Sequence, residues 1–218
     1  MVATKFTLKY DSNIGFATDA GGRGFQQPCD IAIRSDHRIF VASRGRGPTV
    51  GIQMVSRDFD FFGKIGSQGK DIGQMLEPSA LAFDSTENLY VADEKLNRIT
   101  RFDYEGVVID SWGVAGSEPG QFDHPTGLLI INDVVFVVDA LNHRIQKYTT
   151  NGDFIGQWGD KGSCGETLKY PWGISGAING DIYVADWGND RVVRFTQDGE
   201  FVSDLHKGEG TELHLKRP

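Results

Sequence analysis

Residues 127–158 read GLLIINDVVFVVDALNHRIQKYTTNGDFIGQW, and this stretch decides the fold. Two apolar runs, at 127–131 and 134–138, are short enough to be strands buried on both faces. The segment at 144–148 alternates polar and apolar residues, as a half-exposed strand does. An Asn-Gly turn of the kind favoured in hairpins then leads to a fourth segment at 154–158. Because polarity rises from the first segment to the fourth, we predict a four-stranded antiparallel sheet whose first strand is innermost.

The same pattern recurs through the chain. Successive repeats start at Pro28, Pro78, Pro125, Pro171 and Pro218, with spacings of 50, 47, 46 and 47 residues. A fixed period of this length indicates a repeat architecture. The predicted strands of the other repeats are 31–33, 38–42, 51–55 and 59–65 in the first, 80–83, 89–92, 98–102 and 107–112 in the second, and 173–175, 182–185, 191–195 and 201–203 in the fourth. Four-stranded antiparallel sheets at this period are the blades of a β-propeller, so we predict an all-β fold.

One propeller domain accounts for the whole chain, 1–218. The blades expected from the repeat are 1–27 (outer strands only), 28–66, 67–114, 115–160, 161–205 and 206–218 (the start of a further blade). Residues 6–16 align with the third and fourth strands of a repeat, so the count is four complete blades plus a partial one, as part of a six-bladed ring. A five-bladed ring, which would lack only two inner strands, is the alternative. We therefore expect these residues to be a fragment of a longer protein. The alternative is an open arc that self-associates through its unpaired blade edges.

Residues 139–145 (DALNHRI) resemble the signature of the NHL-repeat family, and residues 93–99 (DEKLNRI) and 186–192 (DWGNDRV) are variants in phase with it. Residues 120–128 (GQFDHPTGL) resemble the start of a blade in that family. The resemblance covers nearly the whole chain and implies a propeller that is typically six-bladed. We expect the Asp that ends the second strand to meet the Arg that opens the third and to bind loop amides, pinning each blade. The first repeat departs from this pattern with Ser43.

Composition limits the partners. The net charge of the 218 residues is −8, which disfavours nucleic acid, including the RNA that some NHL propellers bind. No apolar run approaches the roughly 20 residues that cross a bilayer, so no membrane partner is expected. Residues 1–6 lack the apolar stretch of a secretion signal, and the compartment is left open. Cys29 and Cys164 lie nearly three periods apart, so we expect free thiols, buried or half-buried, and not a disulfide.

The positions that differ between repeats gather on one face of the predicted propeller. Antiparallel order puts the start of strand one, the end of strand two, the start of strand three and the end of strand four at the same rim of the central channel. Concave positions at such a mouth are the usual binding sites. The variable residues there are Cys29, Arg44, Arg46, Ser79, Glu94, Lys95, His124, Thr126, Leu141, His143, Trp172, Trp187 and Asp190.

Six of these are our candidate partner-binding residues. Arg44 and Arg46 lie in the only basic loop of this face, and Trp172 and Trp187 belong to one blade and are close enough in sequence to approach each other. An Arg pair opposite exposed aromatic rings suits a carboxylate-bearing ligand or a protein contact anchored by Arg and Trp. The ordinary alternative is that Trp172 packs between blades and the arginines are solvated. The candidates are Arg44, Arg46, Lys95, His143, Trp172 and Trp187.

An enzymatic function has less support. The chain is also similar, more distantly, to the peptidyl-amidoglycolate lyases, in which a His directly after the blade-start Pro binds zinc in several blades. Here those positions hold Cys29, Ser79, Thr126 and Trp172, and only Arg44 matches the lyase pattern. There is no nucleophile elbow and no phosphate-binding loop. We predict no catalytic residue, no metal ligand and no cofactor. Zinc stays open without being indicated, and so does calcium, because acidic residues are scattered over the loops.

The sequence therefore favours a non-catalytic binding or scaffold propeller. Its loop-bearing face and channel mouth would hold a protein or peptide partner. The alternative is a propeller enzyme of the lyase or lactone-hydrolase type with its site at the same mouth.

Overall fold

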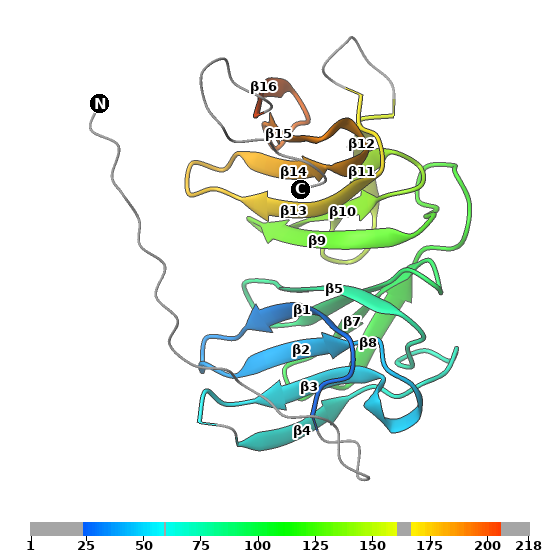
Figure 1. Ribbon diagram of the computed structural model, residues 1–218, viewed down its shortest axis with the longest axis vertical. Helices are drawn as coiled ribbons and strands as arrows, with labels where there is room; N and C mark the ends of the chain where they lie inside the picture. Colours follow the sequence, from blue (N-terminus) through cyan, green and yellow to red (C-terminus); the bar gives the residue numbers. More distant parts are fainter. Residues whose placement is uncertain (1–23, 59, 161–166, 206–218) are drawn as a thin grey trace.

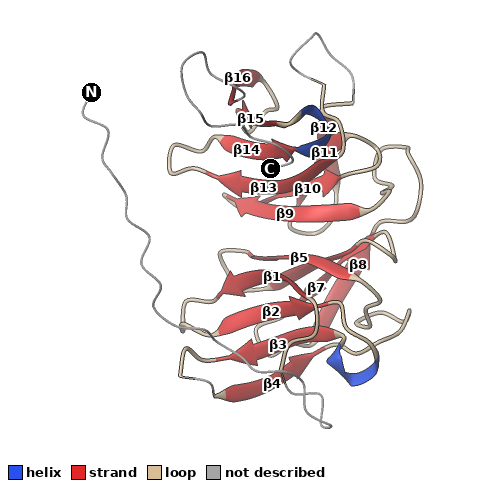
Figure 2. Ribbon diagram, in the orientation of Figure 1, coloured by secondary structure: helices blue, strands red, loops and turns tan. Residues whose placement is uncertain are grey.

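The computed structural model of the protein describes residues 24–58, 60–160 and 167–205. These residues form sixteen strands in four antiparallel sheets of four, each sheet in chain order (Figure 1). The strands are β1 Pro28–Ile33, β2 Ile39–Ser43, β3 Gly51–Val55, β4 Phe61–Ile65, β5 Pro78–Phe83, β6 Leu89–Asp93, β7 Arg98–Phe102, β8 Val108–Trp112, β9 Pro125–Ile131, β10 Val134–Asp139, β11 Arg144–Thr149, β12 Phe154–Trp158, β13 Pro171–Gly176, β14 Ile182–Asp186, β15 Arg191–Phe195 and β16 Phe201–Leu205. The helical elements of these ranges are two three-residue turns, η1 Gly47–Thr49 and η2 Trp187–Asn189 (Figure 2).

The first strand of each sheet is the innermost. Strand β1 contacts β5, β5 contacts β9, and β9 contacts β13, so the sheets fan outward from a shared line of first strands. This arrangement is that of propeller blades, and the prediction of an all-β propeller with four complete blades is confirmed. Residues 1–23 and 206–218 lie outside the described residues, so the partial blade and the six-bladed ring stay predictions.

The inner strands begin earlier than the sequence predicted. Strands β5 and β9 start at Pro78 and Pro125, two residues before the predicted starts. A proline has no N–H for the ladder and reads as a strand breaker. In the structure each of these prolines pairs with the end of the second strand, Asp93 or Asp139, and an irregularity in the register follows directly. The bulge lets the chain pass the proline and resume the ladder.

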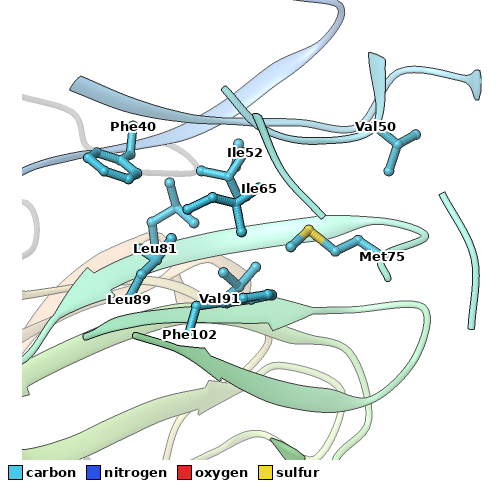
Figure 3. Packing of buried hydrophobic residues seen from close by; sticks show 10 residues of the cluster. Phe40, Val50, Ile52, Ile65, Met75, Leu81, Leu89, Val91 and Phe102 are labelled. Carbon is cyan, nitrogen blue, oxygen red and sulfur yellow. The ribbon is translucent and has the colours of Figure 1, made fainter. Parts of the chain in front are cut away.

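The hydrophobic core lies between the blades. In the first interface Phe40 and Ile52 of one sheet face Leu81 and Phe102 of the next, with Met75 among them (Figure 3). All five side chains are buried. Burial of this kind stabilises by roughly 1.5–3 kcal/mol for each large apolar side chain. The faces between blades, and not the sheets alone, therefore hold the fold together.

In the second, third and fourth blades, one residue from the lead-in loop, the segment before an inner strand, packs between two blades. Met75, Phe122 and Leu168 occupy the same repeat position, and each is buried in a successive core cluster. The repeat thus supplies one apolar plug for each interface, and loss of a plug leaves a cavity.

The aspartate–arginine prediction is confirmed in two blades. Arg144 Nε donates to Asp139 Oδ2 at 2.8 Å, and Arg191 Nε donates to Asp186 Oδ2 at 2.7 Å. The second blade, with Asp93 and Arg98, differs from these two. The first blade differs as well, because Ser43 stands at the position of the Asp. The Ser43 hydroxyl is buried and has no hydrogen-bond partner in the described part of the chain.

Asp93 and Arg98 bind the lead-in loop separately. The Asp93 carboxylate accepts the N–H groups of Leu76 at 2.7 Å and of Lys95 at 3.0 Å. Arg98 donates to the carbonyl oxygens of Lys70 at 2.9 Å, Asp71 at 2.7 Å and Gln74 at 2.8 Å. The two side chains still pin the blade, but the described contacts include no hydrogen bond between them.

A tryptophan of one blade lies over a hairpin glycine of the next. Gly152 has φ +85°, and a Cβ built there would lie 2.8 Å from Trp112 Cδ2. Gly199 has the same φ and the same relation to Trp158, at 2.7 Å. The close approach of the indole ring requires glycine at these turns.

We expect Gly152→Ala to lower the free energy of unfolding by more than its match, Gly120→Ala. Gly120 also has φ +85°, but nothing lies within 4 Å of a Cβ built there. Backbone strain alone predicts a loss of about 1–2 kcal/mol at Gly120. At Gly152 the overpacking against Trp112 adds about 1–3 kcal/mol. Urea unfolding of both variants measures the difference, and equal losses would contradict a role for the indole contact.

Candidate functional site

The lead-in loops and the ends of the second strands meet at one rim. Backbone N–H groups donate across this junction from Arg44 to Gln27 O at 3.2 Å and from Glu94 to Glu77 O at 3.1 Å. These bonds hold the variable loops of the first two blades on one face, where the sequence predicted them. The rim is therefore where side chains from several blades can act on one ligand.

An ion pair joins the first two blades at this rim. Arg44 Nη1 and Nη2 donate to the two carboxylate oxygens of Glu94 at 2.8 and 2.9 Å, and its Nε donates to Pro78 O at 3.1 Å. Burial raises the pKa of Glu94, Arg44 lowers it, and the neighbouring Glu77 raises it again. The two paired residues stand at the same repeat position, directly after Ser43 and Asp93. The guanidinium of Arg44 is therefore held by an ion pair, contrary to the ordinary alternative, although 23% of its side chain is exposed.

A cavity of about 550 Å³ opens beside this ion pair, between the first two blades. Its lining includes three of the candidate residues, Arg44, Arg46 and Lys95, together with Glu77. Arg46 and Lys95 are exposed. Within the described residues their side chains make no hydrogen bond or ion pair, whereas Arg44 is committed to Glu94. The structure thus brings two uncommitted cations from adjacent blades to one concave surface.

A second cavity, of about 530 Å³, follows the inner strands along the channel. Its lining includes the residue after each lead-in proline. Three of these tie their blade to the next: Cys29 Sγ donates to Pro78 O at 3.0 Å, Ser79 Oγ to Pro125 O at 2.6 Å, and Thr126 Oγ1 to Trp172 O at 2.8 Å. At three of the four positions where the resemblance to the peptidyl-amidoglycolate lyases would imply a zinc-binding His, the side chain present forms a bond between blades.

Trp172 ends this series and turns its ring to the channel. Half of the residue is exposed, 51%, so it does not pack between described blades as the ordinary alternative held. Asp30 lines the same cavity and accepts the N–H of Leu81 at 2.7 Å. Trp172 and Asp30 together give the channel an aromatic and an acidic wall.

Cys29 is more exposed than the sequence suggested, although its thiol packs under Pro78. Desolvation raises the pKa of this thiol against the lowering effect of Arg44, so it stays protonated near neutral pH and is a poor nucleophile. Desolvation also raises the pKa of Asp30. Cys164 lies outside the described residues.

His143 connects two blades. Its Nδ1 accepts the N–H of Tyr170 at 3.1 Å, and the two rings meet edge to face with centroids 4.5 Å apart. Asn97 occupies the same repeat position and accepts the N–H of His124 at 2.9 Å. His143 therefore lies at the rim but not in either cavity. Trp187, in η2, is 38% exposed and is also outside both linings.

The sequence did not predict which residues contact Arg44. Glu94 was noted as variable but not as the counter-ion of Arg44, and Gln26 and Gln68 of the first cavity were not considered. A signal for Glu94 existed, because an Arg and a Glu at the same repeat position of adjacent blades carry opposite charges. No such signal marks the glutamines.

Metal-binding clusters and membrane-spanning helices can be assessed for residues 24–58, 60–160 and 167–205. No group of three or more His, Cys, Asp or Glu side chains is placed there to hold a metal ion. Neither helical turn in those ranges has the length or the apolar character needed to cross a bilayer.

Comparison with known proteins agrees with the fold. Virginiamycin B lyase from Staphylococcus aureus superposes with a TM-score of 0.64 at 13% identity, over 85% of this chain and 57% of that one. A streptogramin B lyase gives 0.65 at 14% identity, over 85% and 56%, and Kuenenia stuttgartiensis hydrazine synthase gives 0.62 at 16%, over 90% and 52%. The shared feature is the propeller fold. This chain spans a little over half the length of each, and no protein-family model and no curated protein matches its sequence.

We expect Arg44 and Glu94 to be energetically coupled. A double-mutant cycle with Arg44→Gln and Glu94→Gln should give a coupling energy of about 1–3 kcal/mol, because each side chain left alone is a poorly solvated charge. The matched cycle is Lys147 with Asp198, a pair at 3.1 Å whose carboxylate is 86% exposed, and its coupling should be below about 0.5 kcal/mol. Urea unfolding measures both cycles. Equal coupling energies would contradict the blade-joining role of Arg44.

Proposed function

We propose that this chain is a non-catalytic binding propeller that holds a protein or peptide partner on its loop-bearing face, at the channel mouth. The observation that carries the proposal is the first cavity. It is concave, it is built from two blades, and it presents Arg46 and Lys95 without partners among the described residues. Arginine in a concave, well-packed setting is a frequent anchor of protein contacts. We further propose, on residues 139–145 and their in-phase variants, that the chain is a divergent NHL-repeat propeller.

An enzyme at the same mouth is the second candidate. Two of the similar structures are named as lyases, which favours it. Against it, the side chains of Cys29, Ser79 and Thr126 already form hydrogen bonds between blades. The protonated thiol of Cys29 is also poorly suited to attack a substrate. The binding proposal therefore takes the first place.

A peptide-display selection on the immobilised 218-residue chain tests the binding proposal. Selected peptides should lose about tenfold or more in affinity for Lys95→Trp, because a large ring at Lys95 fills the cavity mouth. The control is Glu105→Trp, an exposed position in the β7–β8 turn on the opposite face. A selection that yields no peptide above background would overturn the proposal, and so would equal binding by both variants.

A further inference from the structure

We propose that the surface bound in this cavity is acidic: a peptide segment whose Asp or Glu carboxylates are held by Arg46 and Lys95. This inference deepens the proposed function and rests on it. It concerns the cavity between the first two blades and not the channel.

Two cations from neighbouring blades meet at this cavity without an ion-pair partner among the described residues. Most described arginines are already satisfied, for example Arg101 by Asp110 at 2.6 Å and Arg191 by Asp186 at 2.7 Å. Arg44, in the cavity wall, is satisfied by Glu94. Arg46 and Lys95 are cations that no described carboxylate neutralises. A ligand carboxylate would supply the missing acceptors in charge-assisted hydrogen bonds.

Two glutamine amides add donors to the same lining. Gln26 Oε1 accepts from Arg46 N at 3.1 Å and from Thr49 Oγ1 at 2.8 Å. Gln68 Oε1 accepts from Gly47 N at 2.9 Å. Because both carbonyl oxygens are engaged, the amide that remains for a ligand at each residue is the NH₂ donor. The cavity is therefore rich in donors, which suits an acceptor ligand such as a carboxylate.

The negative net charge of the chain favours a short anionic ligand over a long one. At −8 the chain repels a long polyanion, which would bring many charges close to its acidic surface. A short acidic segment brings only a few charges and places them beside Arg46 and Lys95. The lining also holds Glu77, which forms an ion pair with neither cation within the described residues. A cavity of about 550 Å³ lies in the range of ordinary ligand pockets.

Fluorescence anisotropy with the full 218-residue chain tests the inference. The probes are fluorescein-labelled hexaglutamate, hexaglutamine and hexathymidylate. Hexaglutamate should bind about tenfold or more tightly than hexaglutamine. Arg46→Gln with Lys95→Gln should weaken hexaglutamate binding by about tenfold or more, because the charge-assisted hydrogen bonds to its carboxylates are lost. Arg46→Lys with Lys95→Arg should keep most of the affinity. The charge-matched control, Arg38→Gln with Arg57→Gln in the β1–β2 and β3–β4 turns on the opposite face, should leave it unchanged.

Three outcomes would overturn the acidic inference: equal binding of hexaglutamine, an unchanged affinity in the Arg46→Gln, Lys95→Gln variant, or tighter binding of hexathymidylate than of hexaglutamate. In each case peptides from the display selection that still lose affinity for Lys95→Trp would leave the proposed function standing. Circular dichroism of every variant shows whether it is folded. Because the two substituted side chains are exposed, we expect unchanged spectra.

Discussion

The Asp139→Asn chain is expected to lose about 3–5 kcal/mol of its free energy of unfolding. Asp139 is fully buried, and its carboxylate accepts the N–H of Asp123 at 2.7 Å together with side-chain donors of Asn142 at 2.9 Å, Arg144 at 2.8 Å and Gln146 at 2.9 Å. Arg144 is itself buried, 2% exposed. Removing the negative charge leaves this guanidinium without its counter-ion in a region with little water. The cost of that uncompensated charge sets the size of the effect.

Urea unfolding followed by tryptophan fluorescence measures this loss, with two matched variants for scale. Asp186→Asn removes the same residue of the next blade, but the side chain of its partner Arg191 is more exposed, 11%, so the loss should be smaller. Asp198→Asn removes an exposed carboxylate and should change the free energy of unfolding by less than about 0.5 kcal/mol. A loss at Asp139 no larger than that at Asp198 would contradict the buried network.

Phe122→Ala is expected to lower the free energy of unfolding by about 3–5 kcal/mol. Phe122 is the fully buried plug between the second and third blades, and its ring lies 5.7 Å from that of Tyr148. It also packs on Gly113, where a Cβ would come within 2.5 Å of the ring. Truncation leaves a cavity that neither sheet can fill without moving relative to the other.

The control for this prediction is Phe154→Ala. The ring of Phe154 lies at the same distance from Tyr148, 5.7 Å, but the residue is 39% exposed. Loss of the aromatic contact alone should cost about 0.5–1.5 kcal/mol. Similar losses in the two variants, measured by urea unfolding, would show that the plug contributes no more than a ring contact.

The networks that hold the blades also position the candidate site. The Asp93 carboxylate accepts the N–H groups of Glu77 at 3.2 Å and Lys95 at 3.0 Å, and both residues line the first cavity. The structural Asp at the end of a second strand thus places the side chains of the binding face. For this reason the signature residues of the repeat and the variable residues beside them have different roles. The signature residues hold the loops, whereas the variable residues either join neighbouring blades, as Arg44 and Glu94 do, or face the solvent, as Arg46 and Lys95 do.

Much of the fold follows from local patterns. The period near 47 residues, the alternation at 144–148 and the Asn-Gly turns predicted the strands to within about two residues, because these signals act over neighbouring positions. The exception is β1, which begins at Pro28, three residues before its predicted start, and there too a bulge carries the ladder past the proline. The pairing of Arg98 with loop carbonyls was also not predicted, since the Asp and Arg of one repeat could satisfy their hydrogen bonds in more than one way.

At the candidate site the sequence predicted which residues lie at the rim, but not how their charges are paired. The repeat pattern alone was enough to predict the blades, the shared rim of their variable loops, and the presence of Arg44, Arg46 and Lys95 at that rim. The packing of one blade on the next was needed to see that Arg44 binds Glu94, 50 positions away, while Arg46 and Lys95 form no ion pair within the described residues. Strand alternation and turn chemistry depend on adjacent residues, whereas the partner of a charged side chain depends on how closely one blade packs against the next.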